Sequence, residues 1–429
     1  MSFNPLAEKG IPVEQQFRSW KMLNVKPYDA RNVDPYTRTR VICMNGIEVE
    51  SIMFSHQFAR HCGDMDVRRK LAMARAVEQQ QQKAVNWLIP GEESTLEVTL
   101  GYEQVAVDLT AWLARTEPDP KVRMALEFAL LEDFDHLYMY ANLYDLLEGK
   151  KAEQITHDLT EIIPGRPTAL HHRPPQDRVL EPVDFKVADP LSMMHIMTIV
   201  AAEQQTMNFY MNVGNRPTEP LARALYLEIA QVEEEHVTHY ESLIDPSKSW
   251  FERNVMHQYH ECYMYYSFMI HESVPYIKDI WELHLQQEIG QLHVACDLMK
   301  QHERKDPAEM LPAELPEPVK FQENKDFVRE VLAKQVHLEK SGAGYKPIWD
   351  LPADASFHDF QRILHGDFVP SYETIGKNIE KNGKDYRLQT EGEHPVKAFR
   401  DRDAVPRAEG VIAHRDDLSG KAKSEAEVV

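Results

Sequence analysis

The sequence predicts an all-α protein, an antiparallel helical bundle formed from four related helical hairpins. Apolar residues recur at i, i+3 and i+4 from about Cys43 to Glu303, with only short turn-like breaks. Acidic residues recur at fixed intervals along the same segment. Hydrophobic residues make up 43% of the chain, but no run approaches the roughly 20 apolar residues of a membrane-spanning helix. We therefore expect helices that pack on one another and do not cross a membrane.

Net charge and the number and spacing of cysteines limit which partners and metal sites the protein can have. The chain has 48 basic and 69 acidic residues, a net charge of −21 and no segregated basic patch, which argues against nucleic acid as a partner. The N-terminus lacks the basic and apolar regions of a secretory signal, so we expect a cytoplasmic protein. No C-x-x-C pair is present, which excludes a zinc ribbon or a rubredoxin-type iron centre. A metal would have to be bound by Glu, Asp and His.

Composition divides the chain into three parts. Residues 1–43 form a Pro-punctuated N-terminal arm, and residues 303–429 form a mostly irregular C-terminal extension with one helix at about 324–340. Between them lies a duplicated helical domain, 44–302. Its hairpins are expected at about 44–88, 96–147, 191–244 and 251–302.

The repeat is carried by acidic residues in register. The first helix of each hairpin has one glutamate in an apolar context, and the second helix has an acid three positions before His or Gln. The first-helix residues are Glu48, Glu103, Glu203 and Glu261; the second-helix pairs are Glu78 with Gln81, Asp133 with His136, Glu233 with His236 and Glu288 with Gln291. Thirty residues separate the two acids in the first three hairpins and 27 in the fourth.

This spacing suits metal ligation. Residues i and i+3 share one face of a helix, so Asp133 and His136 can meet one ion or two adjacent ions. Acids about equally far from the hairpin turn lie at one level of the bundle. Only short turns join hairpins one to two and three to four, whereas more than 40 Pro-rich residues, enough for a crossover along the bundle, join hairpins two and three. Pairing these two assembles the predicted ligands Glu103, Asp133, His136, Glu203, Glu233 and His236.

Hairpins one and four would then flank this site. Their set is Glu48, Glu78, Gln81, Glu261, Glu288 and Gln291, in which glutamine, a weak ligand for transition metals, replaces both histidines. We interpret it as a decayed or structural copy. His260 and His284 lie near those acids in the sequence, so a second metal site stays open.

Other residues of these helices have simpler interpretations. Glu234 and Glu235 are expected on a solvated acidic face, because only Glu233 keeps the register of the repeat. Tyr140 and Tyr240 fall seven residues after Asp133 and Glu233 on the same helical face. Core packing is the expected role of both tyrosines, with a hydrogen bond to a ligand as the alternative.

The helical block resembles the ferritin-like superfamily of di-iron carboxylate proteins over about residues 44–302. The segment LLEDFDHLYMY is similar to the Glu-Glu-x-x-His helix of rubrerythrin-like proteins, with Asp133 in place of the second Glu, and QVEEEHVTHYESL supplies Glu233 and His236. The resemblance implies two iron ions, with manganese as an alternative metal. It also implies Glu103 and Glu203 as terminal ligands, Asp133 and Glu233 as bridges, and one histidine on each ion.

The resemblance implies a di-iron oxidoreductase that reacts with peroxide or dioxygen. Since the rubredoxin cysteines are missing, a separate electron-donor protein would supply electrons. Three alternatives remain: a di-iron oxygenase acting on an organic substrate, a ferroxidase or iron-storage protein, and a non-enzymatic ferritin-like scaffold. The long duplicated chain fits a storage cage poorly. The sequence names no catalytic residue beyond the ligands and leaves a homodimer open.

Overall fold

The computed structural model describes residues 3–342 and 344–426, and it confirms the all-α class. Within these residues the only strands form one two-stranded antiparallel hairpin. The helices are α1 Trp20–Leu23, α2 Pro35–His61, α3 Met65–Asn86, α4 Thr95–Thr116, α5 Pro120–Glu148, α6 Glu153–Thr156, α7 Pro190–Val213, α8 Pro220–Glu241, α9 Trp250–His271, α10 Pro275–Glu303, α11 Lys325–Gln335, α12 Ser356–His365, α13 Pro370–Asn382 and α14 Ala408–Ala426; the strands are β1 Leu338–Ser341 and β2 Gly344–Pro347.

Local signals in the sequence explain where the long helices begin. Helices α2, α5 and α7 each have proline in the first turn after an aspartate whose carboxylate accepts a backbone N–H of that turn. Helices α4 and α9 begin instead with a capping box, Ser94 with Glu97 and Ser249 with Glu252. These caps satisfy N–H groups that the helix itself leaves unpaired.

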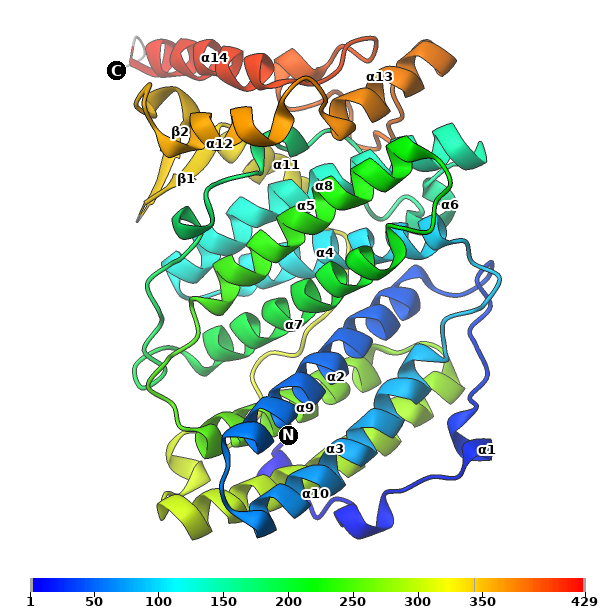
Figure 1. Ribbon diagram of the computed structural model, residues 1–429, viewed down its shortest axis with the longest axis vertical. Helices are drawn as coiled ribbons and strands as arrows, with labels where there is room; N and C mark the ends of the chain where they lie inside the picture. The colour runs from blue at the N-terminus through cyan, green and yellow to red at the C-terminus, as the bar shows by residue number, and fades with distance from the viewer. Residues whose placement is uncertain (1–2, 343, 427–429) are drawn as a thin grey trace.

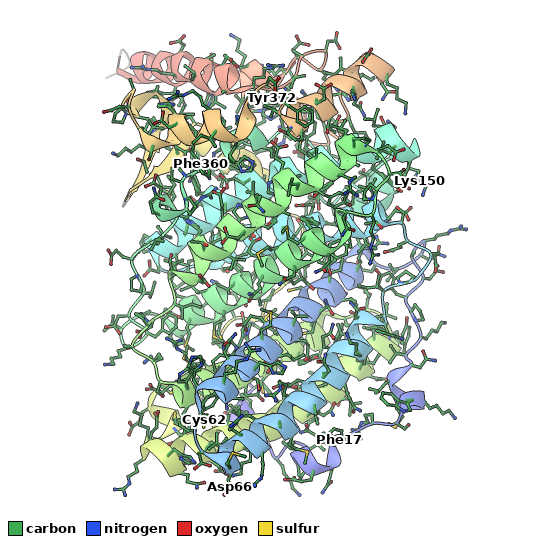
Figure 2. The ribbon with its side chains drawn as sticks, viewed as in Figure 1. Phe17, Cys62, Asp66, Lys150, Phe360 and Tyr372 are labelled. Carbon is green, nitrogen blue, oxygen red and sulfur yellow. The ribbon has the colours of Figure 1, made fainter. Side chains whose placement is uncertain are left out.

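The eight long helices form two bundles that lie next to each other along the long axis of the molecule (Figure 1). One contains α2, α3, α9 and α10, and the other contains α4, α5, α7 and α8. Helix α2 packs against both α4 and α7, and one hydrophobic core extends through both bundles. Figure 2 shows the side chains of the two bundles on the same ribbon. Hairpins two and three thus share a bundle, as the loop lengths predicted, although their origin from one repeated unit stays a prediction.

The crossover between α5 and α7 is held tightly against α5. The Asp135 carboxylate accepts hydrogen bonds from the backbone N–H of Gly165 at 2.9 Å and of Thr168 at 2.8 Å, and from the Thr168 hydroxyl at 2.8 Å. A side chain at position 165 would collide with the Leu131 carbonyl oxygen. Glycine is therefore the residue that allows the crossover to approach the α5 backbone so closely.

The two ends of the chain differ from expectation. Helix α2 begins at Pro35, inside the arm expected at 1–43, because a proline in the first turn of a helix starts the helix and does not interrupt it. The extension is not mostly irregular with one helix: after α11, which ends at Gln335, come the β-hairpin, α12, α13 and α14. Proline and glycine separate these helices into pieces too short to show a long apolar period.

The extension packs on the second bundle. The Tyr138 hydroxyl of α5 donates to Asp385, and the Ser371 backbone N–H donates to Glu228 of α8 at 2.7 Å. Helix α13 lies against both α5 and α8 (Figure 1). None of the described helices combines the length and apolarity needed to cross a lipid bilayer.

Candidate metal centre

The fold brings the six predicted ligands together at the centre of the second bundle. Helices α4 and α7 each contribute a glutamate, and α5 and α8 each contribute an acid and a histidine. Their donor atoms form two groups, each with all atoms within 4.8 Å of one another: Asp133, Glu203, Glu233 and His236 in one, and Glu103, His136 and Glu233 in the other. All six side chains are at most 1% exposed. Glu233 belongs to both groups, which is the arrangement expected for two neighbouring ions.

The two imidazoles face the carboxylates through Nδ1. His136 Nδ1 lies 3.0 Å from Glu233 Oε1, and His236 Nδ1 lies 3.2 Å from Asp133 Oδ1. Neither nitrogen has a hydrogen-bond partner. The two carboxylate oxygens of Asp133, of Glu203 and of Glu233 also have none. So many buried polar atoms without partners are rare in folded proteins. Their convergence and their chemistry, oxygen and imidazole nitrogen without thiolate, fit iron or manganese.

Hydrogen bonds fix the imidazoles in the orientation that ligation needs. His236 Nε2 lies 3.0 Å from Glu132 Oε2, so the proton of this imidazole is assigned to Nε2 and the Nδ1 lone pair is free. His171 of the crossover orients the His136 ring in the same way, by a hydrogen bond to its Nε2. His171 Nε2 donates to the Arg166 carbonyl at 2.7 Å, and its Nδ1 accepts from His136 Nε2 at 3.2 Å. Both histidines therefore direct a lone pair at the acids.

The pKa values of the central acids show that the cluster lacks enough positive charge to keep every carboxylate ionised. Burial, and then the charge of neighbouring acids, raises the pKa of Glu103 well above its usual value. Burial and Asp133 do the same to the pKa of Glu203. Burial also disfavours a charged Glu233, but His136 and His236 outweigh it and lower the pKa of Glu233 to about 2. Without a cation the cluster retains protons, and a divalent ion would displace them.

A buried group of arginines surrounds Glu132, the acid next to Asp133. Arg166 Nη1 contacts Glu132 at 2.8 Å, Arg173 Nη2 at 2.5 Å and Arg178 Nη1 at 3.4 Å, and all four residues are at most 1% exposed. Burial would raise the pKa of Glu132, but Arg173, His171 and Arg178 hold it well below its usual value. Glu132 is thus a permanent anion that orients His236, held by three arginines of the crossover.

The support from the crossover was not predicted from the sequence, and the predicted position of Glu235 is wrong. Glu132 was considered only as a neighbour of Asp133, and the crossover only as a spacer. Glu235 is not on a solvated face: it is 6% exposed and pairs with Arg178. The available signal was the concentration of Arg and His between residues 166 and 178, within a chain of net charge −21.

Tyrosines enclose one side of the centre. The Tyr210 hydroxyl donates to Glu103, and the rings of Tyr140, Tyr210 and Tyr226 lie with centroids 5.0–5.8 Å apart. The hydroxyls of Tyr140 and Tyr240 are buried without a hydrogen-bond partner. Tyr210 and Tyr226 also line a pocket of about 300 Å³ between α7 and α8. Tyr210, which the sequence did not indicate, therefore separates this pocket from Glu103.

The flanking set converges as well, but its polar contacts are different. Gln81 and Gln291 donate amide N–H groups to Glu288, Gln258 donates to Glu78 and Glu261 at 2.8 Å each, and the Tyr265 hydroxyl donates to Glu48. Amide and hydroxyl donors thus take up one oxygen of each of these four acids, and the other oxygen of each has no hydrogen-bond partner. His260 and His284 do not restore nitrogen ligation, since His260 Nε2 meets Thr198 Oγ1 and His284 Nδ1 meets the Tyr265 hydroxyl.

A scan of protein-family models, a search of curated proteins and a search of solved structures each give no match to this chain.

Replacing Glu132 tests the arginine group. In Glu132→Gln three buried arginines lose their shared anion, so the free energy of unfolding of the metal-free protein should fall by about 3–5 kcal/mol. Urea denaturation measures this change. Glu330→Gln, at an ion pair that is 61% exposed at the glutamate, is the control and should change stability by less than about 1 kcal/mol. Equal effects of the two substitutions would contradict the role of Glu132.

Replacing Glu288 tests the flanking set through pH. Burial, and then Glu78, raises the pKa of Glu288 to about 8, against an ordinary value of 4.5. Between these values the folded protein holds a proton that the unfolded chain has released, so stability falls as pH rises. Glu288→Gln should be more stable than the natural protein by roughly 2–5 kcal/mol at pH 8, and this difference should shrink towards pH 4.5.

Urea denaturation across this pH range gives the measurement, with exposed Glu282→Gln on the same helix as the control. A parallel pH dependence for Glu288→Gln and the natural protein would show that Glu288 carries no raised pKa.

Proposed function

We propose that α4, α5, α7 and α8 hold two metal ions, iron or iron with manganese, and that the protein is an oxidoreductase reacting with peroxide or dioxygen in the cytoplasm. The observation that carries the proposal is the convergence of two donor groups on a shared Glu233 in a fully buried site. The arrangement supports Glu233 as the bridging ligand. Asp133 belongs to the group of His236 alone. The sequence resemblance to rubrerythrin-like proteins favours the same chemistry.

The residues of the chain would prepare the site in three ways. Glu132 and His171 keep the Nδ1 lone pairs of His236 and His136 directed at the ions. Burial of every donor excludes bulk water, which strengthens the electrostatic interactions inside the site. The Tyr210 hydroxyl holds a proton at the edge of Glu103. When bound, a pair of iron ions would supply the electrons that reduce peroxide or dioxygen.

A second candidate is an oxygenase acting on an organic substrate. It is favoured by the pocket between α7 and α8, because Tyr210 both lines this pocket and donates a hydrogen bond to Glu103. In that case the pocket would receive the substrate and Tyr210 would have to move aside.

Metal analysis tests the centre directly. Protein purified without oxygen and supplied with ferrous iron should contain two ions per chain, one for each donor group. His136→Gln with His236→Gln, which copies the flanking set, should lose both ions because glutamine is a weak ligand. His260→Gln with His284→Gln removes two buried histidines outside the donor groups and should retain them. Absence of iron from the natural protein would favour the scaffold alternative.

The choice of oxidant separates the enzymatic alternatives. By its resemblance to rubrerythrin, the reduced iron-loaded protein should be oxidised faster by peroxide than by dioxygen in stopped-flow absorbance measurements. Faster reaction with dioxygen would favour the oxygenase. Continued uptake of iron beyond two ions per chain, with growth of a mineral core, would favour storage.

A further inference from the structure

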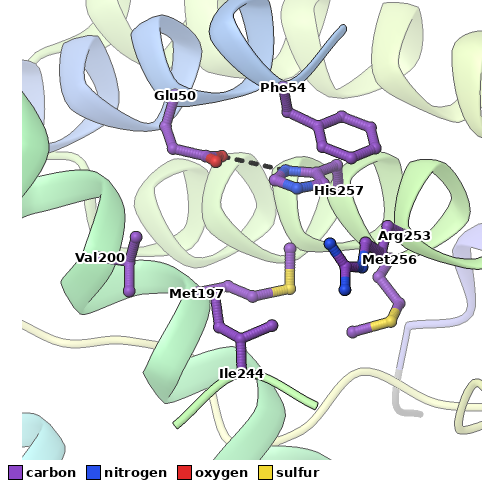
Figure 3. A pocket seen from close by; sticks show the side chains of 8 residues that line it. All are labelled: Glu50, Phe54, Met197, Val200, Ile244, Arg253, Met256 and His257. Atoms are coloured by element: carbon purple, nitrogen blue, oxygen red, sulfur yellow. Dashed lines mark ion pairs between the residues drawn. The ribbon is translucent and has the colours of Figure 1, made fainter. Parts of the chain in front are cut away.

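A second feature of the molecule lies where the two bundles meet. Helices α2, α7 and α9, together with Ile244 in the loop before α9, line a partly open cavity of about 150 Å³, shown in Figure 3. Its walls are mostly apolar and come from Phe54, Met197, Val200, Ile244 and Met256. A cavity of about this size inside a protein can hold a molecule as large as benzene. None of the six candidate ligands lines it, so this space is separate from the candidate metal centre.

Two of the three ionisable residues that line the cavity, Glu50 and His257, have each other as partners. Glu50 Oε2 lies 3.0 Å from His257 Nδ1, drawn as a dashed line in Figure 3. The His257 ring also stacks on Phe54, with centroids 4.0 Å apart and planes inclined by 20°. Both side chains are therefore fixed in the wall of the cavity.

Arg253 is the third ionisable residue. It forms no ion pair with a carboxylate in the described part of the chain, and its guanidinium lies 5.9 Å from the centre of the Trp250 ring. Its Nη2 donates to the Pro246 carbonyl at a long 3.4 Å, and its buried Nε has no hydrogen-bond partner. Figure 3 shows the guanidinium beside the side chains of Met197 and Met256. A buried N–H donor without an acceptor costs free energy, which an acceptor inside the cavity would recover.

The cavity thus combines a small, mostly apolar volume with one guanidinium that has no carboxylate partner among the described residues. Guanidinium groups bind carboxylates through two parallel hydrogen bonds, and methionine sulfur makes favourable contacts with aromatic rings. We propose that this cavity binds a small aromatic monocarboxylate of the size of benzoate, with the ring between Met197 and Met256 and the carboxylate on Arg253. The site does not depend on the proposed metals.

Benzoate itself is the probe for the test. The full-length, metal-free protein is labelled with ¹³C at the methionine methyl groups, and the signals of Met197 and Met256 are assigned by replacing each with leucine. Titration with benzoate should shift these two signals to saturation. Shifts confined to other methionines, or no saturable shift at millimolar benzoate, would overturn the proposal.

Two variants separate the charge from the volume. Arg253→Gln should weaken benzoate binding roughly tenfold or more, because a hydrogen bond between charged groups is lost, and should change binding of neutral benzamide much less. Arg60→Gln, at an exposed position of α2, is the matched control. Ile244→Phe adds volume at the half-buried rim and should remove binding of both compounds.

Unchanged benzoate affinity in Arg253→Gln would show that the cavity selects a ring without a carboxylate, contrary to the proposal. Retained binding in Ile244→Phe would place the ligand elsewhere. Circular dichroism and the midpoint of thermal unfolding establish that each variant is folded before its affinity is compared.

Discussion

Buried carboxylates are the constraint on which the rest of this structure depends, because a charge removed from water must be neutralised where it lies. The protein meets this requirement in two visible ways. Glu132 is neutralised by three arginines of the crossover, and Glu288 by a retained proton and by the amides of Gln81 and Gln291. The central acids have imidazoles but no arginine or amide donor of this kind, which is why a metal cation is the partner proposed for them.

The acid clusters of the two bundles have one polar contact in common and differ in another. A tyrosine hydroxyl donates to a first-helix glutamate in both, Tyr210 to Glu103 and Tyr265 to Glu48. Where the second bundle has histidine, the first has glutamine, whose N–H groups point at the acids. A histidine whose Nε2 is occupied offers a lone pair through Nδ1, whereas an amide with its N–H groups directed inward offers protons. The second bundle thus directs nitrogen lone pairs at its acids, whereas the first bundle directs N–H donors at its acids.

The sequence predicted the six central residues because a helix converts spacing into geometry. Acid and histidine three residues apart must share a face, and acids 30 residues apart across a turn must lie at one level. The crossover offers no such rule. His171 and Arg173 lie in irregular chain, and their positions depend on tertiary contacts such as those of Asp135 with Gly165 and Thr168. The extension escaped prediction for a related reason, since its helices are short and gain their stability by packing on α5 and α8.

The crossover also bears on the order in which the protein is made. His136 leaves the ribosome 100 residues before His236, an interval of about 5–20 s at ordinary rates of synthesis. During that time hairpin two has its own acids but lacks α7 and α8, which later enclose them. The crossover emerges first, and with it His171 and the arginines that Glu132 requires. A nascent chain can therefore satisfy Glu132 before the final helices arrive, whereas Glu103 and Asp133 are enclosed only when hairpin three packs against hairpin two.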